Sequence, residues 1–296
     1  MKYIITGSLG NISKPLATQL IRAGHQVTVI SSDANKKKEI ESMGALAAIG
    51  NIHDEVFLNS AFSEADAVYT MIPPNLQSTD FLKYAADIAT KYANAIQKAG
   101  IRRVVNLSSI GADLSAGTGP ILGNREAEAI LNRLEGFVLT HVRACFFYTN
   151  FYGNMEMIRN MGILGSNYPG SSRVAFVHPE DIARMVAEEL QNDKGSSGVR
   201  YISSDDRTAQ EAATALGKAI GIAALPWVEF PDDQFKSAFL QAGFSEEMAF
   251  RFVEMGQSVR SGKIWEHYDA AGTGTTGKIK LEDFAKEFAA RYSGAK

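Results

Sequence analysis

The chain has 296 residues, of which 45% are hydrophobic and 21% charged, and its formal net charge is −3. This composition is typical of a globular protein with one large core, or with a core and a smaller lobe. The charges are spread without long basic runs, which excludes the electrostatic footprint of a nucleic-acid-binding protein. We therefore expect a small-molecule substrate as partner and no nucleic acid.

The cysteine count and the lack of long apolar runs bear on the cellular compartment. The one cysteine, Cys145, cannot form an internal disulfide, and its neighbours suggest a small buried side chain. No apolar run approaches the roughly 20 residues of a membrane helix, and the N-terminus leads directly into a predicted strand without a signal peptide. These features predict no membrane partner and a cytoplasmic location.

The first segment reads as a strand, a glycine-bearing turn and the start of a helix. An apolar strand at residues 3–6 runs into Gly7 and Gly10, and an amphipathic helix with Pro15 in its first turn follows. Gly7 lets the chain turn sharply, and Gly10 lets the backbone approach a pyrophosphate at the helix N-terminus. The third small position is Ser13 instead of glycine, so the match to the dinucleotide-binding pattern is incomplete. An ordinary strand–turn–helix is the alternative.

Strands and helices alternate through the first half of the chain. Apolar strands separated by helices pair in parallel with both faces covered, which predicts an α/β fold with a doubly wound parallel Rossmann sheet. Ligands of such sheets bind at the carboxyl ends of the strands, so the turns after the strands should line one crevice. Strands are expected at residues 3–6, 26–30, 45–49 (a buried strand), 67–72, 102–107 and 137–142, and the helices include 81–99 and 125–134.

The alternation loosens after residue 143. An aromatic run at 146–152 either roofs a site or belongs to the core, because aromatic side chains dominate protein cores. A capping box at 208–211 predicts the start of a helix that ends near Gly221. Other predicted elements are a strand at 173–177, a helix at 179–190, a strand at 201–203 and a mostly helical segment from 227 to 292.

These elements predict two interleaved lobes. Residues 1–150 should form the nucleotide-binding Rossmann core, together with later core elements from about 173–205. Residues 151–296 should form a smaller, mostly helical C-terminal lobe that folds back over the strand ends as a substrate or lid lobe.

Several stretches, taken in order, resemble the NmrA-like family of atypical short-chain dehydrogenases/reductases. They are residues 7–10, residues 106–112, and residues 128–131 followed by Val142 and Arg143. The likeness continues toward residue 221 and covers nearly the whole chain. It implies an NAD(P)-binding Rossmann domain with a smaller lobe. Members of the family are either quinone-, azo- or triphenylmethane-dye-type reductases or enzymatically silent redox-sensing regulators, and the resemblance does not choose between them.

The chain departs from the family pattern where a proton would move. Many members carry a lysine that contacts the nicotinamide ribose four residues before the position of Glu128, and this chain has Asn124 there. Pro120 stands where a tyrosine would complete the Tyr–Lys pair of ordinary short-chain dehydrogenases. Because an ammonium normally lowers the pKa of that phenol, alcohol oxidation and sugar-nucleotide epimerisation by the usual route are not expected. Asn51 replaces a family aspartate near the adenine, and its carbonyl can accept from the adenine amino group.

Other reactive residue types form no recognisable constellation. The five histidines lie far apart without ligand-spaced partners, so no metal is expected. His178 either faces the crevice or is a structural histidine. Ser108 and Ser109 lack the G-x-S-x-G context of a nucleophile and should instead position nicotinamide or substrate.

The end of the second strand favours NADP over NAD. Ser31 and Ser32 stand there without an acid, and Lys36 lies close behind. A carboxylate would repel a 2′-phosphate, so its absence favours NADP. Asp33 keeps NAD open, because a strand that ends one residue later would bring it to the ribose.

Together these patterns predict an NAD(P)H-dependent reductase that passes hydride to a small planar electrophile such as a quinone. The alternative is a non-catalytic, NAD(P)-binding redox sensor. The expected cofactor-binding residues are Gly7, Ser8, Leu9, Gly10, Asn11, Ile12, Ser31, Ser32, Lys36, Asn51, Ile52, Ile72, Pro73, Ser109 and Asn124. The residues expected to contact the acceptor are Ser108, Tyr148 and Tyr152.

Overall fold

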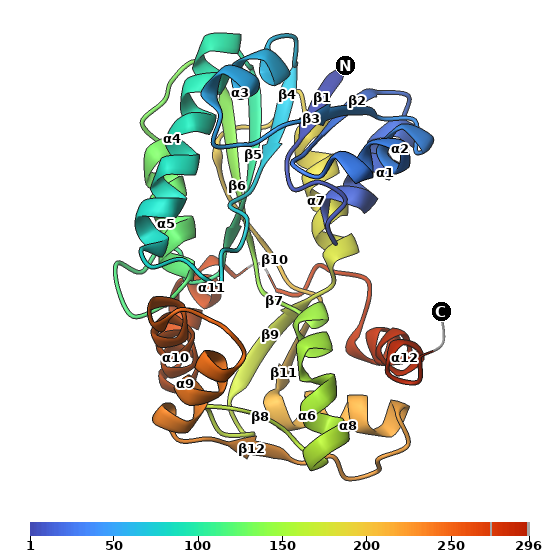
Figure 1. Cartoon of the computed structure of the whole chain (residues 1–296), viewed down its shortest axis with the longest axis vertical. Coiled ribbons are helices and arrows are strands. Elements are labelled where there is room, and N and C mark those ends of the chain that lie inside the picture. Colours follow the sequence, from blue (N-terminus) through green and yellow to red (C-terminus); the bar gives the residue numbers. More distant parts are fainter. Residues whose placement is uncertain (273, 295–296) are drawn as a thin grey trace.

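A seven-stranded parallel sheet forms the centre of the larger lobe, in the upper half of Figure 1. The structure is a computed structural model that describes residues 1–272 and 274–294. The strand order is β10-β6-β5-β4-β1-β2-β3, so the sheet grows outward on both sides of β1 and β4. This order confirms the predicted doubly wound sheet. The strands are β1 (Lys2–Ile5), β2 (Gln26–Ser31), β3 (Leu46–Ile49), β4 (Ala67–Thr70), β5 (Arg103–Ser109), β6 (Val138–Ala144) and β10 (Gly198–Ile202).

Helices cover both faces of this sheet. Side chains alternate between the faces along each strand, so Ile4 and Ile5 of β1 belong to different core clusters. Ile5 packs in the cluster that contains the buried sides of α1 (Ser13–Arg22), α2 (Lys37–Ser42) and α7 (Pro179–Gln191). Ile4 packs with α3 (Glu55–Phe62), α4 (Phe81–Ala99) and α5 (Ile121–Leu131).

The helix predicted at 81–99 and the strand predicted at 173–177 are confirmed, and two other expectations need correction. Strand β3 is not buried: it has only β2 as a neighbour, and Leu46 is 53% exposed. Helix α5 begins at Ile121, four residues before the predicted start. Gly123 lies within this helix, and a Cβ there would lie 2.7 Å from the Phe81 ring, so glycine allows α5 to pack closely on α4.

The smaller lobe is helical, as expected, and also contains two small sheets. One has the order β11-β9-β7, and β12 pairs with β8 in the other. These strands are β7 (Phe146–Phe147), β8 (Leu164–Ser166), β9 (Arg173–Val177), β11 (Asp205–Thr208) and β12 (Trp227–Glu229). The helices are α6 (Met155–Met161), α8 (Ala209–Ala219), α9 (Asp232–Gln241), α10 (Glu246–Ser261), α11 (Glu266–Ala271) and α12 (Leu281–Tyr292), with short 3-10 turns at Ala34–Lys36 (η1), Tyr148–Asn154 (η2) and Lys263–Trp265 (η3).

The chain passes between the lobes at a waist near the centre of Figure 1, where β6 leads to β7, β9 to α7, and β10 to β11. Buried carboxylates tie these crossings to the segment before α12. Asp181 accepts hydrogen bonds from the Ser204 hydroxyl (2.9 Å) and the Ile279 amide (2.9 Å). Asp205 accepts from the Leu281 amide (2.7 Å). Of the helices in the described part of the chain, none has both the length and the apolar character that crossing a membrane requires.

Candidate cofactor and acceptor site

The turn after β1 is held in a conformation that few side chains tolerate. Gly7 has φ +88° and Ser8 φ +56°. The Ser8 amide donates to the carbonyl of Ile30 in β2 (3.0 Å), and the Gly10 amide donates back to the Gly7 carbonyl (3.2 Å). A Cβ at Gly7 would lie 2.7 Å from the Ser13 hydroxyl oxygen, so the sharp turn predicted at Gly7 requires glycine.

Ser13 takes the place of the third glycine for a structural reason. It is buried, and its hydroxyl donates to the Thr6 carbonyl at the end of β1 (2.8 Å). The hydroxyl therefore joins the start of α1 to the strand that precedes the turn. The incomplete sequence match at this position leaves the strand–turn–helix geometry intact.

The turn presents unpaired backbone donors at the start of α1. No described residue accepts a hydrogen bond from the amides of Leu9, Asn11 or Ile12. Gly10 and Asn11 are exposed, and the first turn of α1 contains no acid. Free amides and the positive end of a helix dipole are what a pyrophosphate requires, so these residues fit the phosphates of a dinucleotide.

The residues expected to face the cofactor's ribose lie where β2 finishes. Ser31 is the last residue of β2, and its hydroxyl accepts from the Ser8 hydroxyl (2.9 Å) and from the Asp33 amide (3.2 Å). Ser32 is exposed. The Asp33 carboxylate accepts from the Asn35 amide (2.9 Å) and so begins the short turn η1. The hydrogen bond from Asn35 therefore holds this carboxylate oxygen against the neighbouring backbone.

A pair of lysines shares one carboxylate beside this end. Glu39 accepts from Lys14 of α1 (3.0 Å) and from Lys36 (3.2 Å). Hydrogen bonds from Lys14 and then Lys36 hold the pKa of the Glu39 carboxyl below its usual value. All three side chains are substantially exposed, so these ion pairs contribute little free energy. The lysines can therefore release Glu39 and bind a phosphate instead.

The turn after β3 uses its asparagine locally. The side-chain carbonyl of Asn51 accepts from the His53 amide (2.9 Å). The Asn51 carbonyl oxygen, which was expected to accept a hydrogen bond from the adenine amino group, already accepts one from His53. Its second lone pair can still accept another. Asn51 is exposed and Ile52 is half-buried.

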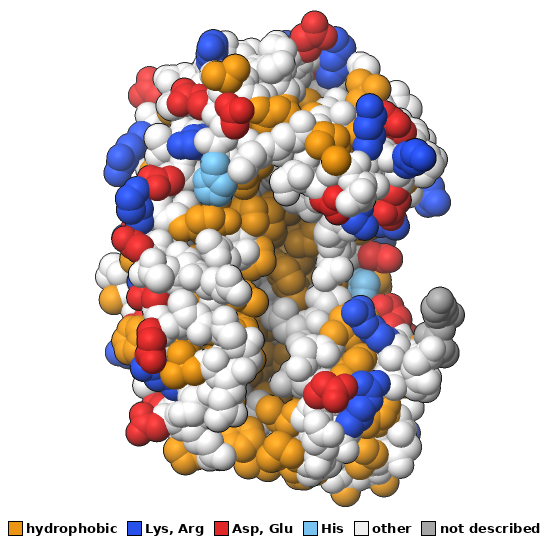
Figure 2. Space-filling view, in the orientation of Figure 1, with side chains coloured by type: hydrophobic (Ala, Val, Ile, Leu, Met, Phe, Trp, Pro, Cys, Tyr) orange, Lys and Arg blue, Asp and Glu red, His pale blue; other side chains and the backbone are white. Residues whose placement is uncertain are grey.

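The carboxyl ends of β4 and β5 face a hollow. Figure 2 shows a deep depression in this face, with hydrophobic side chains along its depth. Ile72, Pro73, Ser109 and Asn124 are all half-buried. Because Ser31 pairs with Ile49 and Thr70 with Asn106, the strands end at one edge and bring these turns together.

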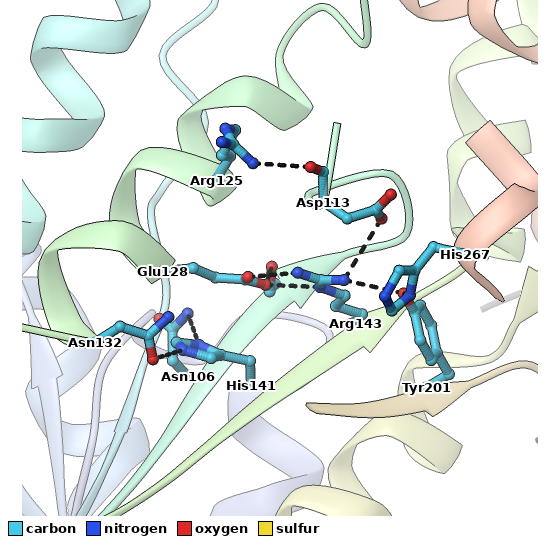
Figure 3. A network of polar contacts seen from close by, with 10 residues as sticks. Asn106, Asp113, Arg125, Glu128, Asn132, His141, Arg143, Tyr201 and His267 are labelled. Atoms are coloured by element: carbon cyan, nitrogen blue, oxygen red, sulfur yellow. Dashed lines mark hydrogen bonds and ion pairs between the residues drawn. The ribbon is translucent and has the colours of Figure 1, made fainter. Parts of the chain in front are cut away.

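Ser108 is bound to a buried carboxylate, which changes its expected role. It is 4% exposed, and its hydroxyl lies 2.5 Å from the Glu128 carboxylate of α5, to which it donates. Arg143 of β6 binds the same carboxylate through Nε (2.9 Å) and Nη2 (2.7 Å), and Figure 3 shows the two groups face to face. The expectation that Ser108 donates to an acceptor is therefore corrected, because its proton is engaged.

Burial and ion pairing act in opposite directions on the two groups. Burial alone would raise the pKa of Glu128, but Arg143, His141 and Ser108 together outweigh it, and the pKa of this carboxyl falls below its usual value. Burial likewise opposes the charge of Arg143, and Glu128 outweighs it and raises the pKa of the guanidinium. Both groups are therefore charged at neutral pH.

A second polar chain runs across the same face of the sheet. Thr70 donates to Asn106 (3.0 Å), whose amide lies 3.2 Å from His141 Nδ1, and His141 Nε2 lies 3.1 Å from the Asn132 carbonyl oxygen. Figure 3 shows His141 between the two asparagines. Burial lowers the pKa of His141, so the ring is neutral. It accepts at Nδ1 and donates from Nε2.

Tyr148 belongs to the core and not to the roof of a site. It is 0% exposed and stacks between Phe176 (5.6 Å) and Phe284 (5.2 Å). Its hydroxyl donates to Asp205 (2.7 Å). Burial, reinforced by this carboxylate, raises the pKa of the phenol. The expectation that Tyr148 contacts an acceptor is therefore wrong, because both ring faces and the hydroxyl are occupied.

Tyr152 packs against α12 and is partly buried. One face stacks on Phe288 (6.1 Å), and the Arg291 guanidinium lies 4.3 Å from the ring centroid. The residue lines a groove of about 570 Å³ between α1 and α12, together with Gly10 and Asn11. The structure places Tyr152 beside the glycine turn after β1, which the sequence did not indicate, and its contact with an acceptor stays a prediction.

His178 combines both of the alternatives left open by the sequence. Its Nδ1 accepts from the Glu180 amide (3.2 Å) and caps α7, and its Nε2 lies 3.3 Å from Glu287. It is 5% exposed and reaches the groove only at its edge. Among the described residues, no group of three or more histidine, cysteine or acidic side chains is arranged to hold a metal ion.

The sequence did not predict that Glu128 and Arg143 form a pair. One signal was available, because Arg143 is a charged residue in an apolar strand, and such a residue needs a buried partner. Glu128 lies one helical turn after Asn124 in α5. The pairing itself depends on how α5 packs on β6, which the local sequence does not specify.

Known proteins share this fold. The chain is 24% identical over 255 residues to an NAD(P)H azoreductase of Xenophilus azovorans, covering 85% of each protein. An NADPH complex of an NADPH-dependent quinone oxidoreductase from Escherichia coli superposes with a TM-score of 0.79 at 18% identity, over 96% of this chain and 99% of the other. An NADP(H) complex of a Citrobacter triphenylmethane reductase does so with a TM-score of 0.79 at 15% identity, over 97% and 99%. The profile of the NmrA-like family matches residues 2–270, and the chain belongs to that family.

Proposed function

We propose that this protein is an NAD(P)H-dependent reductase that passes hydride to a small planar electrophile of the quinone type. The observation that carries the proposal is the set of free amides of Leu9, Asn11 and Ile12 at the start of α1, beside an apolar hollow at the strand ends. A dinucleotide and a flat apolar molecule are the ligands that such a pair of features suits.

The residues at the strand ends fit a dinucleotide. The amides of the turn would hold the pyrophosphate, and Ser31, Ser32 and Lys36 would face the adenosine ribose, with NADP preferred over NAD. Asn51 and Ile52 would lie by the adenine. Ile72, Pro73, Ser109 and Asn124 would border the nicotinamide half.

A bound reduced nicotinamide supplies the hydride in this proposal. The reaction consumes one cofactor, one quinone-like acceptor and one proton from water, and it yields the oxidised cofactor and the hydroquinone. The protein's part is to orient the two molecules and to keep water from the apolar hollow. The developing oxyanion needs one hydrogen bond, from water or from a protein hydroxyl.

No protein general acid is required for this step. The Tyr–Lys pair is replaced by Pro120 and Asn124, and the hydroxyls of Ser108 and Tyr148 are engaged by Glu128 and Asp205. A quinone is already electrophilic, whereas a secondary alcohol would need a base to remove its proton. The azo-, quinone- and dye-reducing names of the similar proteins agree with this acceptor class.

The test is steady-state oxidation of NADPH and NADH with quinones, azo dyes and secondary alcohols. We expect turnover of quinones and none of alcohols. Robust alcohol oxidation would contradict the proposal.

A redox-sensing role is the second candidate, and the engaged hydroxyls of Ser108 and Tyr148 favour it because few donors remain at the strand ends. In that case the cofactor is a sensed ligand whose redox state changes the affinity for a partner. Tight binding of NADPH without turnover of any acceptor would support the sensor and reject the reductase.

A further inference from the structure

A groove of about 570 Å³ opens beside the turn after β1 and is bordered on its other side by α12. Gly10 and Asn11 line one wall of this groove, and Tyr152, Glu287 and Arg291 line the other. Figure 1 shows α12 below α1 at the right-hand edge of the molecule. The last turn of α12 therefore borders the same groove as the free amides to which the proposed function assigns the pyrophosphate.

Helix α12 meets α1 and α7 where both of those helices begin. The two helices lie side by side, and His25, just after α1, lies 3.0 Å from Gln191, the last residue of α7. Their ends are thus neighbours, and so are their starts. Glu287 of α12 lies 3.3 Å from His178, which caps the start of α7. This contact places that part of α12 at the end of the groove where the turn after β1 lies.

The Arg291 guanidinium lies against an aromatic ring and not against an acid. It is 4.3 Å from the centroid of the Tyr152 ring, and that ring stacks in turn on Phe288 (6.1 Å). Among the described residues, no carboxylate oxygen lies within 4 Å of an Arg291 nitrogen. A ring attracts a guanidinium to its face, so the N–H groups of Arg291 stay available to donate.

Glu287 is the acid that would ordinarily pair with Arg291. It precedes Arg291 by four residues in α12, a spacing at which helical side chains form ion pairs. Its carboxylate instead accepts from His178 Nε2. Because His178 Nδ1 accepts from the Glu180 amide, the ring proton lies on Nε2. Glu287 is therefore engaged by a neutral donor, and the charge of Arg291 stays available to a ligand.

The other described cations that line the groove are less suited to a pyrophosphate. Lys14 is bound to Glu39 (3.0 Å), beside the residues expected to face the ribose. Arg22 is the last residue of α1, about 14 Å along the helix axis from its first residue. Arg291 lies on the ring of Tyr152 and so beside the turn itself.

We propose that Arg291 is a binding residue for the pyrophosphate of the dinucleotide, held on the Tyr152 ring so that its N–H groups meet the phosphates across the groove from the turn after β1. The inference rests on the proposed binding of a dinucleotide and not on which acceptor is reduced. NADPH and NADH share the pyrophosphate, so Arg291 serves both cofactors. The match to the family profile ends at residue 270, before α12, so family membership gives Arg291 no role.

Titration of the full-length protein with NADPH and with NADH, at fixed ionic strength, tests the assignment. Arg291→Met keeps an apolar chain on the Tyr152 ring and removes the charge. We expect this variant to bind both cofactors about tenfold more weakly, because it loses one charge-assisted phosphate contact at an exposed position. Arg291→Lys keeps the charge without the planar fork and should recover part of the affinity.

Arg22→Met is the matched control, because it removes the same charge from the same groove at the far end of α1. We expect its affinities for both cofactors to stay within about twofold of the parent. An equal loss in Arg22→Met would indicate a general effect of charge and overturn the assignment. Unchanged affinities in Arg291→Met would overturn it too, as would a loss confined to NADPH, which would place Arg291 at the 2′-phosphate.

A crystal structure of the parent with NADPH is a second test, which does not depend on the stability of any variant. We expect an Arg291 nitrogen within about 3 Å of a pyrophosphate oxygen. An Arg291 guanidinium without a phosphate contact in that complex would overturn the assignment and leave the proposed function standing. A parent that binds neither cofactor in the titration would instead reject the proposed function, and the role of Arg291 with it.

Discussion

Gly10 lies exposed at the tip of the turn after β1, where a side chain would enter the space proposed for the pyrophosphate. Its φ is not positive, and a Cβ would meet only the Gly7 carbonyl, at 3.1 Å. We therefore expect Gly10→Val to lose at least about tenfold in NADPH affinity while the melting temperature stays within about 2 °C of the parent. Gly153→Val is the matched control, because a Cβ there meets nothing within 4 Å. Undiminished affinity in folded Gly10→Val would refute the phosphate site.

Lys36 is the residue proposed to favour NADP over NAD. Its ion pair with Glu39 is exposed and can yield to a 2′-phosphate. We expect Lys36→Ala to weaken NADPH binding by about fivefold and to leave NADH binding unchanged, as measured by titration at fixed ionic strength. Tighter binding of NADH by the parent, lost in Asp33→Ala, would show that Asp33 faces the ribose.

The sequence indicated the phosphate turn but not the state of the hydroxyl groups. A turn of this kind depends on local residue types, such as glycine at φ +88°, and is therefore visible in the sequence. The partners of Ser108 and Tyr148 are 20 and 57 positions away, and only the folded packing brings them together. The acceptor contacts expected from these two residues were wrong for that reason.

Helix α5 is joined to the sheet by a charged pair that resists separation. Glu128 is 6% exposed, and replacing it leaves the buried Arg143 with only the more distant Asp113 carboxylate (3.4 Å) as counter-ion. We expect Glu128→Gln to lower the free energy of unfolding at pH 7 by about 3 kcal/mol.

The pH dependence of that loss follows from the lowered pKa of Glu128. A carboxyl whose pKa is depressed by folding stabilises the fold above its unfolded pKa of about 4.3, and this contribution disappears as the pH falls through the folded value. The difference between parent and variant in denaturant titrations should therefore begin to shrink below about pH 4 and vanish only when the pH falls below the folded pKa. Asp87→Asn, which breaks an exposed pair with Lys83, should give no measurable change at any pH. A loss that persists unchanged at pH 3 would contradict this account.

Long, periodic elements were predictable, and short ones were not. The helix at 81–99 has a continuous buried stripe and ends at Gly100, which adopts φ +63°. Strand β7 spans two residues, and β8 and β12 span three each, too few to show an alternating pattern. The two small sheets therefore appeared only in the structure.

The two lobes of the molecule are not separable at residue 150. The large sheet takes its outer strand β10, and α7 on one of its faces, from the later part of the chain. A fragment of residues 1–150 therefore lacks the partner of β6 and the helix that covers α1. We expect circular dichroism of the fragment to show no cooperative unfolding, whereas the full chain should show it. A sharp transition in the fragment would mean that the first lobe folds independently.

Cys145 lies at the waist, between β6 and β7, where it is 2% exposed and burial raises the pKa of its thiol. A thiol that is neither accessible nor ionised does not react with maleimides, so the native protein has no cysteine that a maleimide label would modify. Cysteines introduced at Val56 in the larger lobe and Met161 in the smaller one, 78% and 59% exposed, would be the only sites to accept a label. A fluorophore pair at these positions would report in real time whether the lobes approach each other when a nucleotide binds.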